Sequence, residues 1–289
     1  ETGSMIMMHA ENGIAIDVLR EQAATQGKLG SVWHGRTRPP ELEGEATHRA
    51  IQLAVVAGAP LYIVHLSSVN ALKEVSRARD EGRNVFAETC PQYLYLTLEE
   101  HLDQPGIDGL RHICSPPLRS SAENHQDNLW MGLRTDDLSV VATDHCPFCD
   151  AEKLLGAEDF RDTPNGLGVI EHRMDLLYQG VLTGEITLQR WVELCSTTPA
   201  RLFGLQGRKG IIAPGADADI VIFNPKTEHV LGASTHHMSI DYSVWEGIKV
   251  QGQSESVMSR GSFVIRDRNF VGKPGHGEFL KRSLPEPLR

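Results

Sequence analysis

Three apolar stretches of this chain end in side chains that commonly bind metal ions, and this pattern limits how the chain can fold. Residues 60–68 have the composition of a buried strand and end in a polar tip that carries His65. Two further stretches have the same form and end on His9 and Asp144. The carboxyl ends of parallel strands meet at one edge of a sheet, so three such strands would bring these side chains to one place.

Strands and helices alternate along most of the sequence. Apolar runs bounded by turn residues predict strands at 5–9, 60–66, 84–89 and 138–143. Helical spacing predicts helices at 14–26, 45–57, 69–81 (with Ser68 as N-cap), 123–134, 169–179, 188–196 and 199–203. Loops are predicted at 27–43 and 146–168. This alternation predicts a parallel sheet, in either a barrel or a doubly wound arrangement.

The character of the sequence changes after Gly204. From there, short β-type runs and glycine-containing turns replace the alternation of strands and helices. We therefore predict an α/β domain at residues 1–203 and a small β module with a C-terminal arm at 204–289. The arm begins at Gly272, where the composition becomes rich in glycine, proline and charge.

Composition excludes several classes of function. The 289 residues carry a formal net charge of −10, which argues against nucleic acid as the main partner. The longest apolar runs are far shorter than the roughly 20 residues of a membrane span, so no membrane partner is expected. Five scattered cysteines, an odd number, fit free thiols in a reducing compartment, and we expect a cytoplasmic protein.

The chemistry of His9, His65 and Asp144 points to a divalent metal such as zinc. Such an ion lowers the pKa of bound water to about 7, and a carboxylate is still needed to accept the proton. Asp144, next to His145, suits that role. Taken singly, each of the three residues could also be a hydrogen-bonded structural residue, and that alternative stays open at this point.

Seven short motifs, taken together and in order, resemble the hydantoinase/dihydropyrimidinase family of cyclic amidohydrolases. The match runs along essentially the whole chain, which makes the set far more specific than any one motif. The motifs are HAENG at 9–13, VHLS at 64–67, ETCPQYL at 88–94, SPPLR at 115–119, TDHCPF at 143–148, PNG at 164–166 and PGADAD at 214–219.

The resemblance implies a TIM-type (β/α)8 hydrolase barrel with a dinuclear centre, usually of zinc. By motif, His9 and His65 would bind the second metal, and Asp144 would bind the first and act as general base and then general acid. Ser115 and Asn165 would hold the ring amide of the substrate through backbone groups. The implied reaction is hydrolytic ring opening of cyclic ureides and imides, such as hydantoin and dihydropyrimidines, by a hydroxide that bridges the metals.

The sequence also departs from the family pattern. It contains no His-x-His pair, and no lysine precedes Lys28, whereas the family uses such a pair and a carbamylated lysine upstream of the HAENG motif. Only four barrel-type strands are predicted, and eight close a barrel. We therefore expect the C-terminal portion of a longer enzyme, with the first strands absent and with three of six metal ligands. By itself, this chain would be inactive or poorly active.

Several alternatives remain at the level of sequence. Allantoinase carries out the same chemistry on another small cyclic ureide. A non-catalytic relative would keep the fold for assembly, although retention of His9, His65 and Asp144 argues against it. A half-barrel that pairs with a second polypeptide is a further possibility. The family commonly forms homotetramers, so the resemblance implies a homo-oligomer.

Overall fold

The computed structural model describes residues 3–284 and divides the chain into two compact units. The first, which we call the α/β unit, consists of Met5–Arg173 and Leu231–Ile248. The second, which we call the β unit, consists mainly of Met174–Val230 and Lys249–Arg289. The domain boundary predicted between residues 203 and 204 divides the chain differently, and it stays a prediction.

The α/β unit is built on a parallel sheet of four strands in the order β1-β2-β3-β4. The strands are β1 (Ile6–Met8), β2 (Leu61–Ile63), β3 (Val85–Thr89) and β4 (Val140–Val141). Each lies within a predicted strand and is shorter than predicted. A doubly wound sheet reverses its strand order at a switch point, so this uninterrupted order favours the barrel arrangement.

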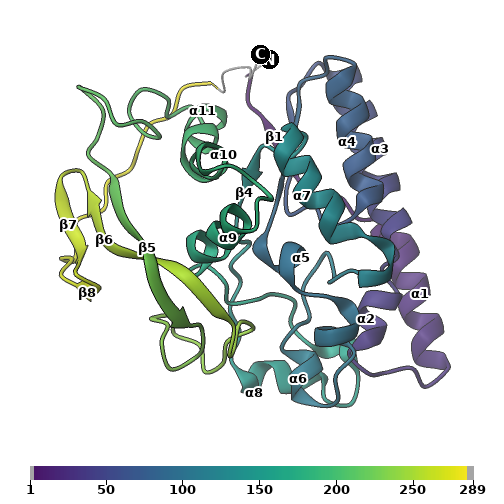
Figure 1. The fold of residues 1–289 in the computed structure, drawn as a ribbon. Helices are drawn as coiled ribbons and strands as arrows, with labels where there is room; N and C mark the ends of the chain where they lie inside the picture. Colours follow the sequence, from purple (N-terminus) through teal and green to yellow (C-terminus); the bar gives the residue numbers. More distant parts are fainter. Residues whose placement is uncertain (1–2, 285–289) are drawn as a thin grey trace. The chain divides into compact units, whose positions relative to one another are not determined.

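Helices connect these strands and pack side by side along the sheet, as Figure 1 shows for α3, α4 and α7. The helices of the unit are α1 (Gly13–Thr25), α2 (Val32–Arg36), α3 (Pro40–Ala57), α4 (Val69–Asp80), α5 (Pro91–Tyr95), α6 (Ile107–Leu110), α7 (His125–Thr135) and α8 (Asp150–Lys153). Single turns occur at η1 (Leu98–Leu102), η2 (Ser121–Glu123), η3 (Leu154–Gly156) and η4 (Phe160–Asp162). The predicted cap of α4 is confirmed, because the hydroxyl of Ser68 accepts a hydrogen bond of 3.2 Å from the backbone N–H of Ala71.

The predicted loop at 27–43 is wrong in part. It contains α2, and α3 begins within it at Pro40 rather than at residue 45. Proline fits the first turn of a helix, where its missing N–H costs no hydrogen bond. The hydroxyl of Ser31, just before α2, donates to the carbonyl of Leu102 at 2.7 Å, so a distant contact holds this helix.

The two edges of the parallel sheet differ in how well they are covered. Both residues of β4, one edge strand, are buried, whereas Ile6 and Met7 of β1, the other edge strand, are each 53% exposed. An exposed apolar edge strand is an open pairing surface.

No helix among the described residues is long and apolar enough to cross a membrane.

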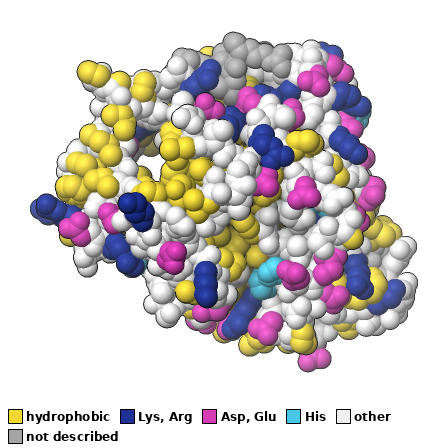
Figure 2. All heavy atoms as spheres, viewed as in Figure 1, with side chains coloured by type: hydrophobic (Ala, Val, Ile, Leu, Met, Phe, Trp, Pro, Cys, Tyr) yellow, Lys and Arg dark blue, Asp and Glu magenta, His cyan; other side chains and the backbone are white. Residues whose placement is uncertain are grey.

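The β unit contains short helices and an antiparallel sheet in the order β5-β6-β7-β8. In Figure 2, hydrophobic side chains gather on the surface over this sheet. Exposed apolar residues of its strands include Val221 and Ile222 of β5 and Phe270 of β8. The helices are α9 (Arg173–Leu182), α10 (Leu188–Val192), η5 (Glu193–Thr197) and α11 (Thr198–Leu202), and the strands are β5 (Ile220–Val230), β6 (Lys249–Ser259), β7 (Ser262–Arg266) and β8 (Asn269–Phe270). The predicted arm has no helix or strand in its described part, residues 272–284.

Candidate active site

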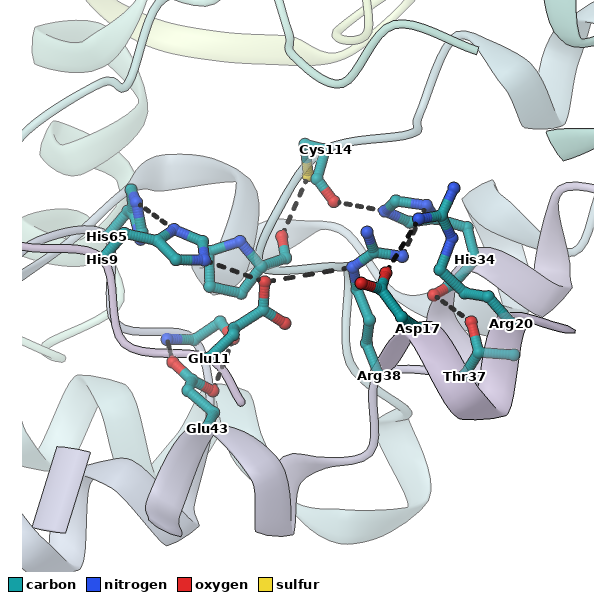
Figure 3. A network of polar contacts seen from close by, with 12 residues as sticks. His9, Glu11, Asp17, Arg20, His34, Thr37, Arg38, Glu43, His65 and Cys114 are labelled. Carbon is teal, nitrogen blue, oxygen red and sulfur yellow. Dashed lines mark hydrogen bonds and ion pairs between the residues drawn. The ribbon is translucent and has the colours of Figure 1, made fainter. Parts of the chain in front are cut away.

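Two histidine rings meet at the carboxyl ends of neighbouring strands of the α/β unit. His9 follows β1 directly and His65 follows β2 by two residues. Nδ1 of His9 lies 3.0 Å from Nε2 of His65, and the ring centroids are 4.8 Å apart (Figure 3). Ligand nitrogens lie about 2.0–2.1 Å from a zinc ion, so two nitrogens at this separation can bind one ion.

Asp144 follows β4, and the structure places it close enough for its charge to act on His65. Burial and the neighbouring His9 lower the pKa of His65, while Asp144 opposes that shift. A lowered pKa keeps the imidazole neutral, which is the form that binds metals. Among the described residues, however, no group of three His, Cys, Asp or Glu side chains has the arrangement of a metal site. His9 and His65 are therefore brought together, and the three-residue ligand set stays a prediction.

The backbone at two of these positions is strained. His65 and Asp144 have φ angles of 40° and 49°, in the left-handed region that residues other than glycine rarely adopt. Such conformations cost about 1–3 kcal/mol each and persist where surrounding contacts fix them. The strained backbone at His65 and Asp144 therefore indicates that surrounding contacts fix the direction of these two side chains at a cost in stability.

Glu11 orients the first histidine. Its Oε2 lies 3.1 Å from Nε2 of His9, and the carboxylate is buried beside the guanidinium of Arg38, at 3.9 Å. Burial alone would raise the pKa of Glu11, but the hydrogen bond with His9 and the charge of Arg38 hold it below its usual value. Because the carboxylate of Glu11 accepts the Nε2 proton, the lone pair of Nδ1 faces His65. A carboxylate in this position on a histidine is common in metal sites.

A buried ion pair fixes the turn that follows His65. The carboxylate of Glu43 accepts from the backbone N–H of Ser67 at 2.8 Å and from its hydroxyl at 2.9 Å. Arg119 donates to the same carboxylate at 2.8 Å and to the hydroxyl of Ser67 at 2.9 Å. The side chains of Glu43 and Arg119 are 2% and 4% exposed, so the contacts are protected from water.

Strand β3 supports the same turn from the other side. The carboxylate of Glu88 accepts from the hydroxyl of Tyr62 at 2.6 Å and from the backbone N–H of His65 at 3.4 Å. Burial raises the pKa of Glu88. The hydroxyl of Thr89 donates to the carbonyl of Leu66 at 2.8 Å. These contacts hold the tip of β2 in one conformation.

The segments that carry Ser115 and Asn165 lie side by side. The backbone N–H of Gly166 donates to the carbonyl of Ile113 at 3.0 Å. Ser115 is partly buried, and its hydroxyl has no hydrogen-bond partner within residues 3–284, while Asn165 is exposed. The structure thus brings together the two segments predicted to bind substrate, and their substrate role stays a prediction.

His34, which had no predicted role, links the Ser115 segment to Arg38. Nε2 of His34 donates to the carbonyl of Cys114 at 2.7 Å, and Arg38 donates to Nδ1 at 3.2 Å (Figure 3). Burial and the charge of Arg38 hold the pKa of His34 well below its usual value, so the ring is neutral. A chain of contacts therefore runs from His9 through Glu11, Arg38 and His34 toward the predicted substrate segment.

The chain is similar in sequence to known proteins along most of its length. Residues 3–264 match the sequence profile described as the amidohydrolase family. The chain is 55% identical to the D-hydantoinase of Streptomyces coelicolor over 289 residues, which is 100% of this chain and 61% of that protein. It is 48% identical to the D-hydantoinase of Geobacillus stearothermophilus over 285 residues, which is 98% of this chain and 60% of that protein.

Solved structures give the same result. A D-hydantoinase from a Bacillus species superposes with a TM-score of 0.96 at 47% identity, over 98% of this chain and 62% of that one. A dihydropyrimidinase from Brevibacillus agri superposes with a TM-score of 0.96 at 45% identity, over 98% of this chain and 61% of that one. The resemblance predicted from the motifs is thereby confirmed. The chain spans about three-fifths of the length of the relatives that it matches.

Proposed function

Because the chain belongs to the amidohydrolase family, we propose that the protein opens the ring of cyclic ureides and imides by hydrolysis, as a hydantoinase or dihydropyrimidinase does. One observation carries the proposal: ring nitrogens of His9 and His65 converge to 3.0 Å at the ends of neighbouring parallel strands. The similarity to proteins named D-hydantoinase and dihydropyrimidinase supports the substrate class.

The paired imidazoles of His9 and His65 suit a divalent ion, and we propose the following ligands. Asp144 would hold the first divalent ion, and His9 and His65 would hold the second, in a dinuclear zinc centre. Such ions polarise the substrate carbonyl and lower the pKa of water to about 7. Asp144 would accept a proton from the attacking water and deliver it to the leaving nitrogen. Glu11 would keep the Nδ1 lone pair of His9 directed at the ion.

Backbone groups at Ser115 and Asn165 would orient the substrate ring. Hydrogen bonds from two adjacent backbone segments can hold both sides of a ring amide. Orientation of this kind raises the rate of reaction because the reacting atoms are held at a fixed separation. The hydrogen bond between Gly166 and Ile113 supports this assignment, since it makes the two segments neighbours.

We further propose that the chain provides four strands of a (β/α)8 barrel, with the remaining strands and metal ligands outside it, and with a domain boundary at 203/204. The half-exposed Ile6 and Met7 of the edge strand β1 support the barrel proposal, as does the fact that the chain covers 61% of the first relative.

A homotetramer and a cytoplasmic location complete the proposal. Figure 2 shows Lys and Arg side chains interspersed with Asp and Glu on the face it displays, which suits a small substrate better than nucleic acid.

The test is turnover of hydantoin, dihydrouracil and allantoin, side by side, by the protein in its longest natural form. Ring opening of hydantoin or dihydrouracil in preference to allantoin is expected. Preference for allantoin would replace the assignment with allantoinase. Absence of turnover of all three, with no metal found by elemental analysis, would indicate a non-catalytic assembly protein.

A further inference from the structure

A lysine is fully buried in the α/β unit and is not used by the proposed chemistry. Lys153, the last residue of α8, is 0% exposed. Its ammonium donates to the carbonyls of Ile113 at 2.9 Å, Pro164 at 2.9 Å and Gly166 at 2.8 Å. A lysine has three N–H donors, so every one of them is used. Lysine is almost never fully buried unless its charge is compensated, and here carbonyl oxygens provide the compensation.

The three acceptors flank the two predicted substrate-binding residues. Ile113 lies two residues before Ser115, and Pro164 and Gly166 are the immediate neighbours of Asn165. One ammonium group thus holds both segments at a fixed separation. The Gly166–Ile113 hydrogen bond of 3.0 Å closes the same contact between backbones.

Other contacts leave these segments little freedom to compensate for loss of the lysine. At Gly166 the φ angle is +151°, and an added Cβ would lie 2.4 Å from the carbonyl oxygen of Cys146. The backbone therefore passes too close to Cys146 for a side chain. On the opposite side, His34 holds the carbonyl of Cys114 at 2.7 Å.

We propose that Lys153 is a positioning residue for substrate binding. It sets the separation between the backbone segments at Ser115 and Asn165, and these segments bind the ring amide of a cyclic ureide. The inference rests on the proposed function and adds to it a residue outside the metal site. Lys153 does not touch the substrate. Its three hydrogen bonds determine where the backbone groups that do touch it are placed.

The protonation state of Lys153 should affect binding. Burial lowers the pKa of Lys153 to about 8. The groups that face it are the thiols of Cys114 and Cys146 and the imidazoles of His34 and His112, and the ring of Phe148 lies 5.6 Å from its nitrogen. Above pH 8 the neutral amine keeps two donors for three carbonyls, so one segment loses its hydrogen bond.

The first experiment compares Lys153→Met with the matched control Lys73→Met, which replaces an exposed lysine of α4. In K153M we expect KM for dihydrouracil to rise about tenfold or more, with kcat nearly unchanged and with the metal content of the wild type. K73M should match the wild type in all three quantities. A folded K153M with an unchanged KM would overturn the proposal, as would a loss of bound metal or a fall in kcat alone.

The second experiment needs no variant. In the wild type, KM for dihydrouracil should rise as the pH passes through about 8, and in a folded K153M that rise should be absent. If K153M does not fold, a wild-type KM that stays constant from pH 7 to pH 10 overturns the proposal, and a rise near pH 8 supports it. A wild type that turns over no cyclic ureide would refute the proposed function itself, whereas an active wild type with the wrong KM behaviour refutes only the role of Lys153.

Discussion

At His9, one buried carboxylate decides which ring nitrogen faces the neighbouring strand. Glu11 contacts Nε2, and Nδ1 points at His65. Only Ala10 separates the histidine from its carboxylate in the sequence, so both residues lie within the HAENG motif. What the sequence could not show is that the backbone after β1 turns the two side chains toward each other.

Replacing Glu11 with glutamine is expected to weaken metal binding by about tenfold, the lower end of the range for groups that orient metal ligands. The amide can still accept the Nε2 proton of His9, but it lacks the negative charge that makes the ring a stronger ligand. Competition with a metal-binding dye measures the affinity. Glu81→Gln, which changes an exposed carboxylate of the Arg83 pair, should leave it unchanged. Equal affinities in E11Q and the wild type would exclude the orienting role.

His34 predicts a dependence of stability on pH. Burial and Arg38 hold its pKa well below 6.5 in the folded protein, while the unfolded chain protonates it near that value. Below about pH 6.5 the unfolded state thus binds more protons, so the free energy of unfolding falls as the pH falls. In His34→Gln this contribution is absent, and urea unfolding at pH 7 and pH 5 should show a smaller loss than in the wild type. An identical loss in both proteins would contradict the assignment.

At the scale of elements, the presence of the four parallel strands and the cap of α4 were predicted, and contacts between distant segments were not. Periodicity placed β2, β3 and the cap of α4 because these depend on residues close in sequence. The Glu43–Arg119 pair joins residues 76 apart, and the Lys153–Ile113 contact joins residues 40 apart. No local pattern signals such partners, and α2 was missed because a distant carbonyl holds Ser31.

The buried pair predicts a large loss of stability. Glu43→Gln would leave the charge of Arg119 buried without a counter-charge, which typically costs about 3–5 kcal/mol. It would also loosen the turn at Ser67 that follows His65. Urea denaturation measures the change in the free energy of unfolding. Glu81→Gln, which breaks an exposed pair, is expected to cost less than about 1 kcal/mol. A similar small cost for E43Q would show that the pair does not support the site.

For the molecule as a whole, the sequence motifs predicted the family, and the fold of the α/β unit agrees with it. The consecutive order of four parallel strands favours the barrel over the doubly wound alternative, which composition and periodicity had left open. The metal centre is less complete. The structure brings two imidazoles together, and the charge of Asp144 acts on His65, but no three-residue ligand group occurs among residues 3–284. The proposed centre assigns the remaining ligands to residues outside this chain's motifs.

The central claim is that the convergence of His9 and His65 serves metal-dependent opening of cyclic ureides. The most direct measurement is hydantoin hydrolysis by the longest natural form of the protein, before and after treatment with a chelator, and after zinc is restored. We predict that the chelator abolishes hydrolysis, that zinc restores it in the wild type, and that zinc fails to restore it in His65→Ala. Hydrolysis that continues in the metal-free protein, or full recovery of the His65 variant, would contradict the account.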